Sequence, residues 1–195
     1  MEDIKAKKAG IRQGIFARRD ALSKEERSQK SAAIMERLFH LANFVEARIV
    51  LFFMSYNSEV DTEPMVRKAL QLEKIVTIPL TDPKKKEIAP FRIDDLDQDV
   101  QPGYRGIREP IAERCKPIPV QYINLAIIPG VAFDTRGGRI GHGIGVYDRF
   151  IPQLDITTRK VALAFECQIV PQIPMDLHDR YIDIIITEKR IVYKI

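Results

Sequence analysis

Five short apolar runs, separated by segments with helical signals, constrain the fold of this chain more than any other feature. The runs are RIVLFF at 48–53, KIVTIP at 74–79, INLAIIP at 123–129, KVALAFE at 160–166 and YIDIIITE at 181–188. Continuous apolar runs of this length are typical of strands that are buried on both faces of a parallel sheet. Their alternation with helices predicts an α/β fold with a mostly parallel sheet.

The segments between these runs carry helix signals. Residues 3–21 place Ile4, Ile11 and Ile15 in one narrow stripe at about 100° per residue, with basic residues beside it. The Ser23–Glu26 spacing is that of a capping box, which predicts a helix from about 24 to 41. We also expect helices at 62–72 and 144–153, a turn at 82–87 and a strand at 88–93, in one domain spanning 1–195.

The composition is that of an ordinary globular protein. The chain has 195 residues, of which 45% are hydrophobic and 30% charged. It has no apolar run long enough for a membrane span and no apolar stretch of a secretory signal at its N-terminus. Cys115 and Cys167 lie far apart, which favours reduced thiols over a zinc site. We therefore expect a cytoplasmic protein that does not bind membranes.

The basic charge is concentrated in the first predicted helix. Six Lys and Arg residues against Glu2 and Asp3 give residues 1–19 a balance of +4, which equals the net charge of the whole chain. The rest is close to neutral, which argues against a broad nucleic-acid surface. Lys84, Lys85 and Lys86 are expected in a solvated turn, whereas Lys8 and Arg12 share one face beside the apolar stripe.

Five of the ten glycines lie within residues 137–145, directly before Tyr147 and Asp148. This stretch follows a predicted buried strand and precedes a predicted helix, the position at which open α/β sheets bind ligands. It matches neither the dinucleotide-binding nor the P-loop spacing. Glycines nevertheless let backbone N–H groups converge on an anion, and Arg139 and Arg149 can bind phosphate oxygens. A flexible surface loop is the alternative.

Three acidic residues are candidate site groups. Asp148 is a natural Mg²⁺ ligand if a nucleotide binds here, although it could equally favour the helix dipole. Asp183 enters an apolar strand, where an acid needs either a cation or a salt bridge. Glu59, in SYNSEVDTEP at 55–64, could accept hydrogen bonds from a heterocycle, while Asp61 and Thr62 could cap the next helix. Tyr104 could stack on a ligand from an ordered loop, or lie in a solvated turn.

In this order, the segments resemble the 5-formyltetrahydrofolate cyclo-ligase family over nearly the whole chain. The resemblance rests on the Lys8-x-x-x-Arg12 spacing and on five motifs: FFMSYNSEVDT, YRGIREP, IIPGVAFDTRGGRIGHGIGVYDRF, ALAFECQIVPQIP and HDRYIDIIITE. It implies a three-layer α/β/α fold, similar to the ribose-phosphate isomerase and CoA-transferase group. It also implies ATP- and Mg²⁺-dependent closure of 5-formyltetrahydrofolate to 5,10-methenyltetrahydrofolate, with release of ADP and phosphate.

The resemblance also implies the site residues. Arg139 and Tyr147 are expected to be catalytic, and Asp148 and Asp183 to be associated with Mg²⁺. The expected ATP-binding residues are Lys8, Arg12, Arg139, Gly141, His142, Gly143, Ile144, Gly145, Val146 and Tyr147. The expected folate-binding residues are Met54, Glu59, Tyr104, His142 and Val146. The partners are then reduced folate and ATP, with no nucleic acid, in a monomer or weak oligomer.

Three residues of the loop depart from the family pattern. The family usually has glycine or lysine at Ile144, glycine or an aromatic residue at Val146, and arginine or an aromatic residue at His142. These departures keep open an ATP-dependent enzyme with a different small acceptor. A nucleotide- or RNA-binding module that uses the basic first helix is a second alternative.

Overall fold

The computed structural model describes residues 2–194. The α-helices are α1 (Glu2–Asp20), α2 (Lys24–His40), α3 (Ala42–Glu46), α4 (Glu63–Gln71) and α5 (Val146–Phe150). Short 3₁₀ helices are η1 (Tyr104–Gly106), η2 (Val120–Tyr122), η3 (Ile151–Gln153) and η4 (Glu166–Gln168). The strands are β1 (Ile49–Leu51), β2 (Ile75–Asp82), β3 (Glu87–Ile93), β4 (Val100–Pro102), β5 (Arg108–Pro110), β6 (Lys116–Pro117), β7 (Leu125–Ile127), β8 (Ala132–Phe133), β9 (Arg139–Ile140), β10 (Arg159–Leu163), β11 (Ile184–Ile186) and β12 (Ile191–Tyr193).

The central sheet contains all five strands that the apolar runs predict. Its order is β12-β11-β10-β7-β1-β2-β3-β6. The neighbours from β11 to β2 pair in parallel, whereas β12, β3 and β6 add antiparallel edges. The α/β fold with a mostly parallel sheet is therefore confirmed.

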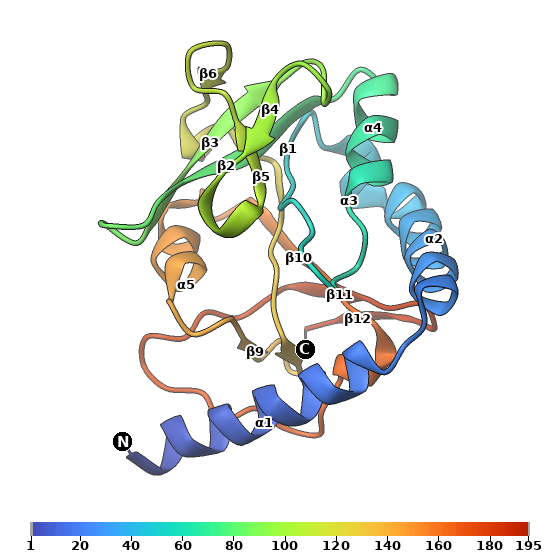
Figure 1. Cartoon of the computed structure of the whole chain (residues 1–195), viewed down its shortest axis with the longest axis vertical. Helices are drawn as coiled ribbons and strands as arrows, with labels where there is room; N and C mark the ends of the chain where they lie inside the picture. Colours follow the sequence, from blue (N-terminus) through green and yellow to red (C-terminus); the bar gives the residue numbers. More distant parts are fainter. Residues whose placement is uncertain (1, 195) are drawn as a thin grey trace.

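Helices cover both faces of this sheet (Figure 1). On one face, α2, α3 and α4 contribute Leu38, Phe44 and Met65 to the larger core cluster. On the other face, α5 and the neighbouring 3₁₀ segments contribute Phe150 and Ile151. The second face is therefore covered by shorter helices than the first.

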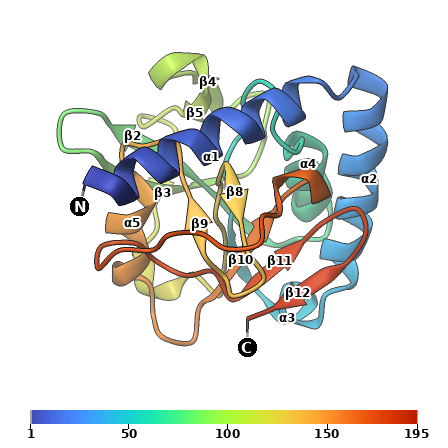
Figure 2. The same cartoon turned by 90° about the horizontal axis from the view of Figure 1, so that it is seen from below.

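Helix α1 lies apart from both layers. Figures 1 and 2 show it passing beside the β8–β9 hairpin and η4, at the end of the sheet where the parallel strands finish. Ile15 anchors it there in a third cluster with Val131, Ala132 and Ile140. The first helix therefore closes the carboxyl edge of the sheet.

The boundaries differ from the sequence-based ones in two informative places. β2 does not end at Pro79 but continues to Asp82, because β1 pairs only with residues 75–77 and the missing N–H of Pro79 breaks no β1–β2 hydrogen bond. The predicted helix at 144–153 is only α5, followed by η3, since Gly145 has a φ of 76° and Pro152 removes a donor. The capping box at Ser23 forms as predicted.

Several small elements carry no strong sequence signal. These are α3, the β4–β5 hairpin, β6 and the β8–β9 hairpin, which lies between β7 and the remaining glycines. Within residues 2–194, none of the helices combines the length and apolar character that crossing a bilayer requires.

Candidate functional site

The basic face of α1 points into the protein. Lys8 is buried, and its ammonium group contacts the carboxylates of Asp179 and Asp176. One helical turn later, Arg12 Nε donates to the Gly141 carbonyl oxygen at 2.8 Å. The first helix therefore brings two cations to the glycine loop and to the segment before β11.

Arg139, on β9, is a deeply buried cation of the site. Its Nη2 donates to Asp148 Oδ1 at 2.6 Å and its Nη1 to the Pro129 carbonyl at 3.2 Å, while Nε has no partner among the described residues. A Cβ added to Gly141 would lie 2.8 Å from Arg139 Nη1. Gly141 therefore lacks a side chain where the guanidinium approaches the loop, rather than for flexibility alone.

The remaining loop is built to expose its backbone. Gly143 and Gly145 have φ values of 104° and 76°, which side chains disfavour. Within the described chain, the N–H groups of residues 141–145 donate no hydrogen bond. Because α5 has only five residues, its dipole adds little to this site. Free N–H groups and neighbouring cations still fit an anion.

The acidic residues are distributed differently from the sequence-based assignment. Arg180 N donates to Asp148 Oδ1 at 3.3 Å, which joins Asp148 to the segment that contains Asp179. Asp183 lies instead at the amino ends of β10 and β11, where it contacts Lys160 Nζ at 2.9 Å. Asp183 therefore forms a salt bridge, which is the alternative to a bound cation that the sequence allows. It lies at the amino ends of the strands, opposite the carboxyl edge of the sheet.

Asp179 was not selected from the sequence. It lies in the same HDRYID motif as Asp183, but only the contact with Lys8, 171 residues away, distinguishes the two aspartates. No cluster of three or more His, Cys, Asp or Glu side chains suitable for a metal occurs in the part of the chain that the structure describes.

A second polar group lies at the carboxyl end of β1. Glu59 accepts from Tyr56 N at 2.9 Å and from His142 Nε2 at 2.8 Å, which links this group directly to the glycine loop. Met54, which precedes the Glu59 segment in the sequence, is buried in the core. Ile144 and Val146 are half-buried on the loop.

Tyr147 follows the loop as the second residue of α5. Its ring packs edge-on against Phe150 at 6.3 Å between centroids. Burial raises the pKa of its hydroxyl above the ordinary value, and the Glu59 carboxylate adds to this increase. Tyr147 is therefore a neutral phenol at physiological pH, available as a hydrogen-bond donor.

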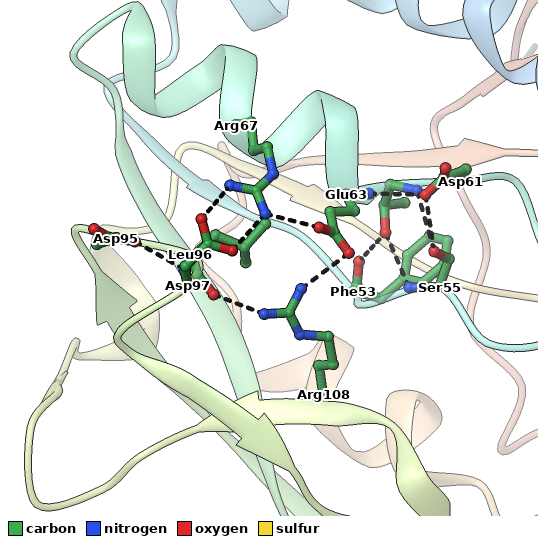
Figure 3. Close-up of polar contacts among 10 residues, drawn as sticks. Phe53, Ser55, Asp61, Glu63, Arg67, Asp95, Leu96, Asp97 and Arg108 are labelled. Atoms are coloured by element: carbon green, nitrogen blue, oxygen red, sulfur yellow. Dashed lines mark hydrogen bonds and ion pairs between the residues drawn. The ribbon is translucent and has the colours of Figure 1, made fainter.

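Tyr104 lies on η1, between the two strands of the β4–β5 hairpin. Buried Glu109 holds this turn by accepting from Tyr104 N at 3.1 Å and from Thr81 N at 3.2 Å. On the other side, Arg108 donates to Glu63 at 2.9 Å, which fixes the hairpin to α4 (Figure 3). The Tyr104 turn is therefore held by hydrogen bonds on both sides, while Arg105 and Gly106 within it are exposed.

Two site groups were missed by the sequence analysis. Arg19 is one of the basic residues of the first helix and has no signal of its own, yet it is buried and bonded to Ser58. Glu109 has no signal beyond its place in the YRGIREP motif. A charged residue in a periodic helix looks the same in sequence whether its helix faces solvent or closes a sheet edge.

Comparison with known proteins agrees with this geometry. A curated 5-formyltetrahydrofolate cyclo-ligase from Mus musculus is 27% identical over an alignment of 199 residues, gaps included, and the alignment covers 95% of each chain. The solution structure of the Aquifex aeolicus 5,10-methenyltetrahydrofolate synthetase superposes with a TM-score of 0.85 and 29% identity, covering 96% of this chain and 92% of that one. A 5,10-methenyltetrahydrofolate synthetase from Mycoplasma pneumoniae shares the fold, with a TM-score of 0.75, 21% identity and coverage of 93% and 98%.

The family assignment rests on nearly the full length. The model of the 5-formyltetrahydrofolate cyclo-ligase family matches residues 4–188, a span that includes α1, the glycine loop and the segment of Asp179. This chain belongs to the 5-formyltetrahydrofolate cyclo-ligase family of ligase enzymes.

Proposed function

We propose that this chain uses ATP to close 5-formyltetrahydrofolate to 5,10-methenyltetrahydrofolate. The observation that carries the proposal is the approach of Arg12 and Arg139 to Gly141 of the glycine loop. Lys8 pairs with Asp179, in the segment whose Arg180 N donates to Asp148. Family membership supports ATP as co-substrate and reduced folate as substrate. It also favours this reaction over a different small acceptor, despite Ile144 and Val146.

The charge pairs of the site suit an exchange of partners on nucleotide binding. Lys8 is paired with Asp179, and Arg139 with Asp148. A triphosphate offers oxygens that compete for the cations, with the free N–H groups of residues 141–145 as further donors. The carboxylates so released are hard oxygen ligands, of which Mg²⁺ needs only one or two when phosphates supply the rest.

The donor set therefore fits Mg²⁺, with Asp148 and Asp179 as the carboxylates that would hold it. We assign Asp179 in place of Asp183, because Asp183 contacts Lys160 at the amino ends of its strands. When bound, Mg²⁺ would neutralise phosphate charge.

The proposed reaction has two steps. The formyl oxygen attacks the γ-phosphorus, the bond to ADP breaks, and the formyl group carries a phosphate. The neighbouring amine nitrogen then attacks the formyl carbon and loses its proton, the carbon–oxygen bond breaks, and phosphate leaves. Phosphorylation is needed because an amide oxygen is a poor leaving group. Arg139 would bind the transferring phosphate and Tyr147 would donate a hydrogen bond near it, so that the protein contributes mainly by positioning and neutralisation.

The folate is expected at the carboxyl end of β1, near Glu59, Met54 and Tyr104, with His142 and Val146 on the side of the loop. The two free cysteines agree with a cytoplasmic location. The burial of Lys8 and Arg19 removes two cations from the basic face that an RNA-binding module would use.

The direct test is a spectroscopic assay. Purified protein with 5-formyltetrahydrofolate, ATP and Mg²⁺ should show growth of the near-ultraviolet absorbance of the conjugated methenyl product. The product should form with one ADP released per ring closed, and omission of either ATP or Mg²⁺ should abolish it. ATP binding without product would reject the cyclo-ligase proposal in favour of another acceptor. Salt-sensitive RNA binding without ATP hydrolysis would favour the binding module.

A further inference from the structure

Asp134, in the turn between β8 and β9, is a buried carboxylate that backbone groups hold. Its residue is 2% exposed. Its Oδ1 accepts from Arg136 N and Gly138 N, both at 2.9 Å, and its Oδ2 accepts from Ile173 N at 2.8 Å. None of the salt bridges within residues 2–194 includes it. Because a buried carboxylate is costly unless hydrogen bonds compensate it, these three N–H groups fix its position.

Two of these hydrogen bonds lie within the turn 134–138 and fix its shape. Asp134 N also donates to the Gly138 carbonyl at 3.1 Å, and Gly137 N donates to the Asp134 carbonyl at 3.0 Å. A Cβ added to Gly138 would lie 2.7 Å from Asp134 Oδ2, so the carboxylate occupies the space of a side chain. Arg139 follows directly, as the first residue of β9. The turn therefore sets the position of Arg139.

The same turn holds both ends of a loop that precedes β11. Ile173 N, at the first end, donates to Asp134 Oδ2. Ile182 N, at the second end, donates to the Gly137 carbonyl at 2.8 Å. Gly137 has a φ of 82°, and a Cβ added there would collide with the Ile182 carbonyl oxygen. Figure 2 shows this loop beside the β8–β9 hairpin. We call residues 173–182 the clamped loop, because one short turn holds it at both ends.

The clamped loop contains groups of the proposed nucleotide site. Asp179 contacts the Lys8 ammonium group, and Arg180 N donates to Asp148 Oδ1 at 3.3 Å. Asp148 in turn accepts from Arg139 at 2.6 Å. The turn between β8 and β9 therefore positions the Arg139 guanidinium through β9 and the Asp179 carboxylate through the clamped loop.

We propose that Asp134 is a positioning residue for phosphoryl transfer, which fixes the clamped loop, and with it Asp179, relative to Arg139 and Asp148. This inference rests on the proposed function. Asp134 acts through Asp179 and touches no substrate, since its own oxygens are occupied by the turn and by Ile173. Because phosphoryl transfer depends on positioning, release of the loop should slow it even though no group that binds substrate is removed.

Asp134→Asn separates the two functions of the carboxylate. An amide has one acceptor oxygen, so it can satisfy either the turn or Ile173, but not both. Two hydrogen bonds hold the oxygen in the turn and one holds it at Ile173, which favours release of the clamped loop. Hydrogen exchange, measured by mass spectrometry on the ligand-free protein, should become faster in the clamped loop by about tenfold, the loss of one hydrogen bond to a charged group. Exchange in β8 and β9 should not change.

The kinetic signature should appear in the Mg²⁺ requirement and in kcat. Asp134→Asn should lower kcat and raise the Mg²⁺ concentration for half-maximal activity, each by about tenfold, while the KM for the folate stays within about twofold. Asp82→Asn is the matched control, because Asp82 also accepts from two backbone N–H groups, those of Lys84 and Lys85, in the β2–β3 turn. It should change none of these quantities.

A double-mutant cycle tests whether Asp134 acts through Asp179. If it does, adding Asp134→Asn to Asp179→Asn should change the Mg²⁺ requirement by less than about twofold, because coupled residues are not additive. Additive effects of the two substitutions would reject the inference. A rise in the KM for the folate equal to the rise in the Mg²⁺ requirement would also reject it, since it would indicate a general structural role.

A second variant keeps the inference falsifiable if Asp134→Asn does not fold, as judged by circular dichroism. Gly137→Ala releases the clamped loop at Ile182 and should give the same faster exchange and the same Mg²⁺ signature. Unchanged exchange and an unchanged Mg²⁺ requirement in a folded variant would overturn the inference and leave the cyclo-ligase proposal intact. If the wild-type protein closes no ring, the proposed function fails, and with it the role of Asp134 in phosphoryl transfer.

Discussion

Two arginine clusters in this molecule differ in burial and in the number of their carboxylate partners. At the proposed nucleotide site, the Arg139 side chain is 2% exposed and has one carboxylate partner, Asp148, while its Nε has no partner within residues 2–194. Beside α4, the Arg67 side chain is 41% exposed and bonds to both Glu63 and Asp97, the cluster drawn in Figure 3. Buried charges with few partners are costly in the free protein, whereas exposed charges with many partners are not.

The difference in burial and in partners indicates different roles: the Arg139 cluster is suited to ligand binding, and the Arg67 cluster to structural support. In the Arg139 cluster, Nε is a donor for which the described residues supply no acceptor. The Arg67 cluster is complete, and through Glu63 it holds Arg108 and so the hairpin that carries Tyr104. Substitutions in the Arg139 cluster should therefore change catalysis. Substitutions in the Arg67 cluster should change stability, or the position of the Tyr104 hairpin and with it folate binding.

The largest effect is expected for Arg139→Ala. Loss of the guanidinium removes a phosphate donor and should lower kcat/KM for ATP by at least about a hundredfold. It also leaves Asp148 without its cation, which should lower the free energy of unfolding by about 1–3 kcal/mol. Steady-state kinetics and urea unfolding measure the two effects. Lys85→Ala, in the exposed β2–β3 turn, is the control and should change neither; equal losses in both variants would contradict the assignment of the loop.

A smaller effect is expected for Asp148→Asn. The amide oxygen can still accept from Arg139, so the geometry is kept while the negative charge is lost. The Mg²⁺ concentration for half-maximal activity should rise by about tenfold. Asp179→Asn should behave in the same way and Asp183→Asn should not. A shift in the Mg²⁺ titration for Asp183→Asn alone would restore the sequence-based assignment.

Arg108→Gln tests the link between the Arg67 cluster and the hairpin that carries Tyr104. It removes the contacts with Glu63 and with the Leu96 carbonyl and loosens the Tyr104 turn. We expect the KM for the folate to rise by about threefold to tenfold, a change that lies within the free energy of one hydrogen bond to a charged group. The KM for ATP should not change. Arg114→Gln, which is exposed in the same region, is the matched control. A change in kcat with no change in KM would assign Arg108 a role in the chemical step instead.

The smallest effect is expected for Arg67→Gln, and it should disappear in acid. Burial favours the neutral form of Glu63, but hydrogen bonds from Arg67 and Arg108 outweigh it and lower its pKa. The Arg67 hydrogen bond lowers the pKa of Asp97 as well.

These lowered pKa values stabilise the folded state above about pH 4, and the contribution disappears as the pH falls through the folded-state values. Urea unfolding at pH 7 and pH 3 should therefore show a smaller loss of stability for Arg67→Gln than for the wild type. An equally steep loss in both proteins would show that this cluster does not stabilise the fold.

The sequence by itself determined the elements and the chemistry that they carry. Apolar runs predicted five strands, because burial on both faces demands continuous apolar residues. Ser23 and Glu26 predicted the start of α2, because a capping box depends only on near neighbours. The ordered motifs were sufficient to indicate the family, and the glycines before Tyr147 indicated an anion-binding loop.

Only the tertiary structure decided which charges meet. Lys8 contacts Asp179 across 171 residues, and His142 contacts Glu59 across 83. Lys85 and Lys8 are both lysines among charged neighbours, yet one is exposed and the other is buried. Their difference arises because α1 closes the carboxyl edge of the sheet, and such long-range placement depends on the packing of the whole chain rather than on local spacing. The same packing buries Arg19.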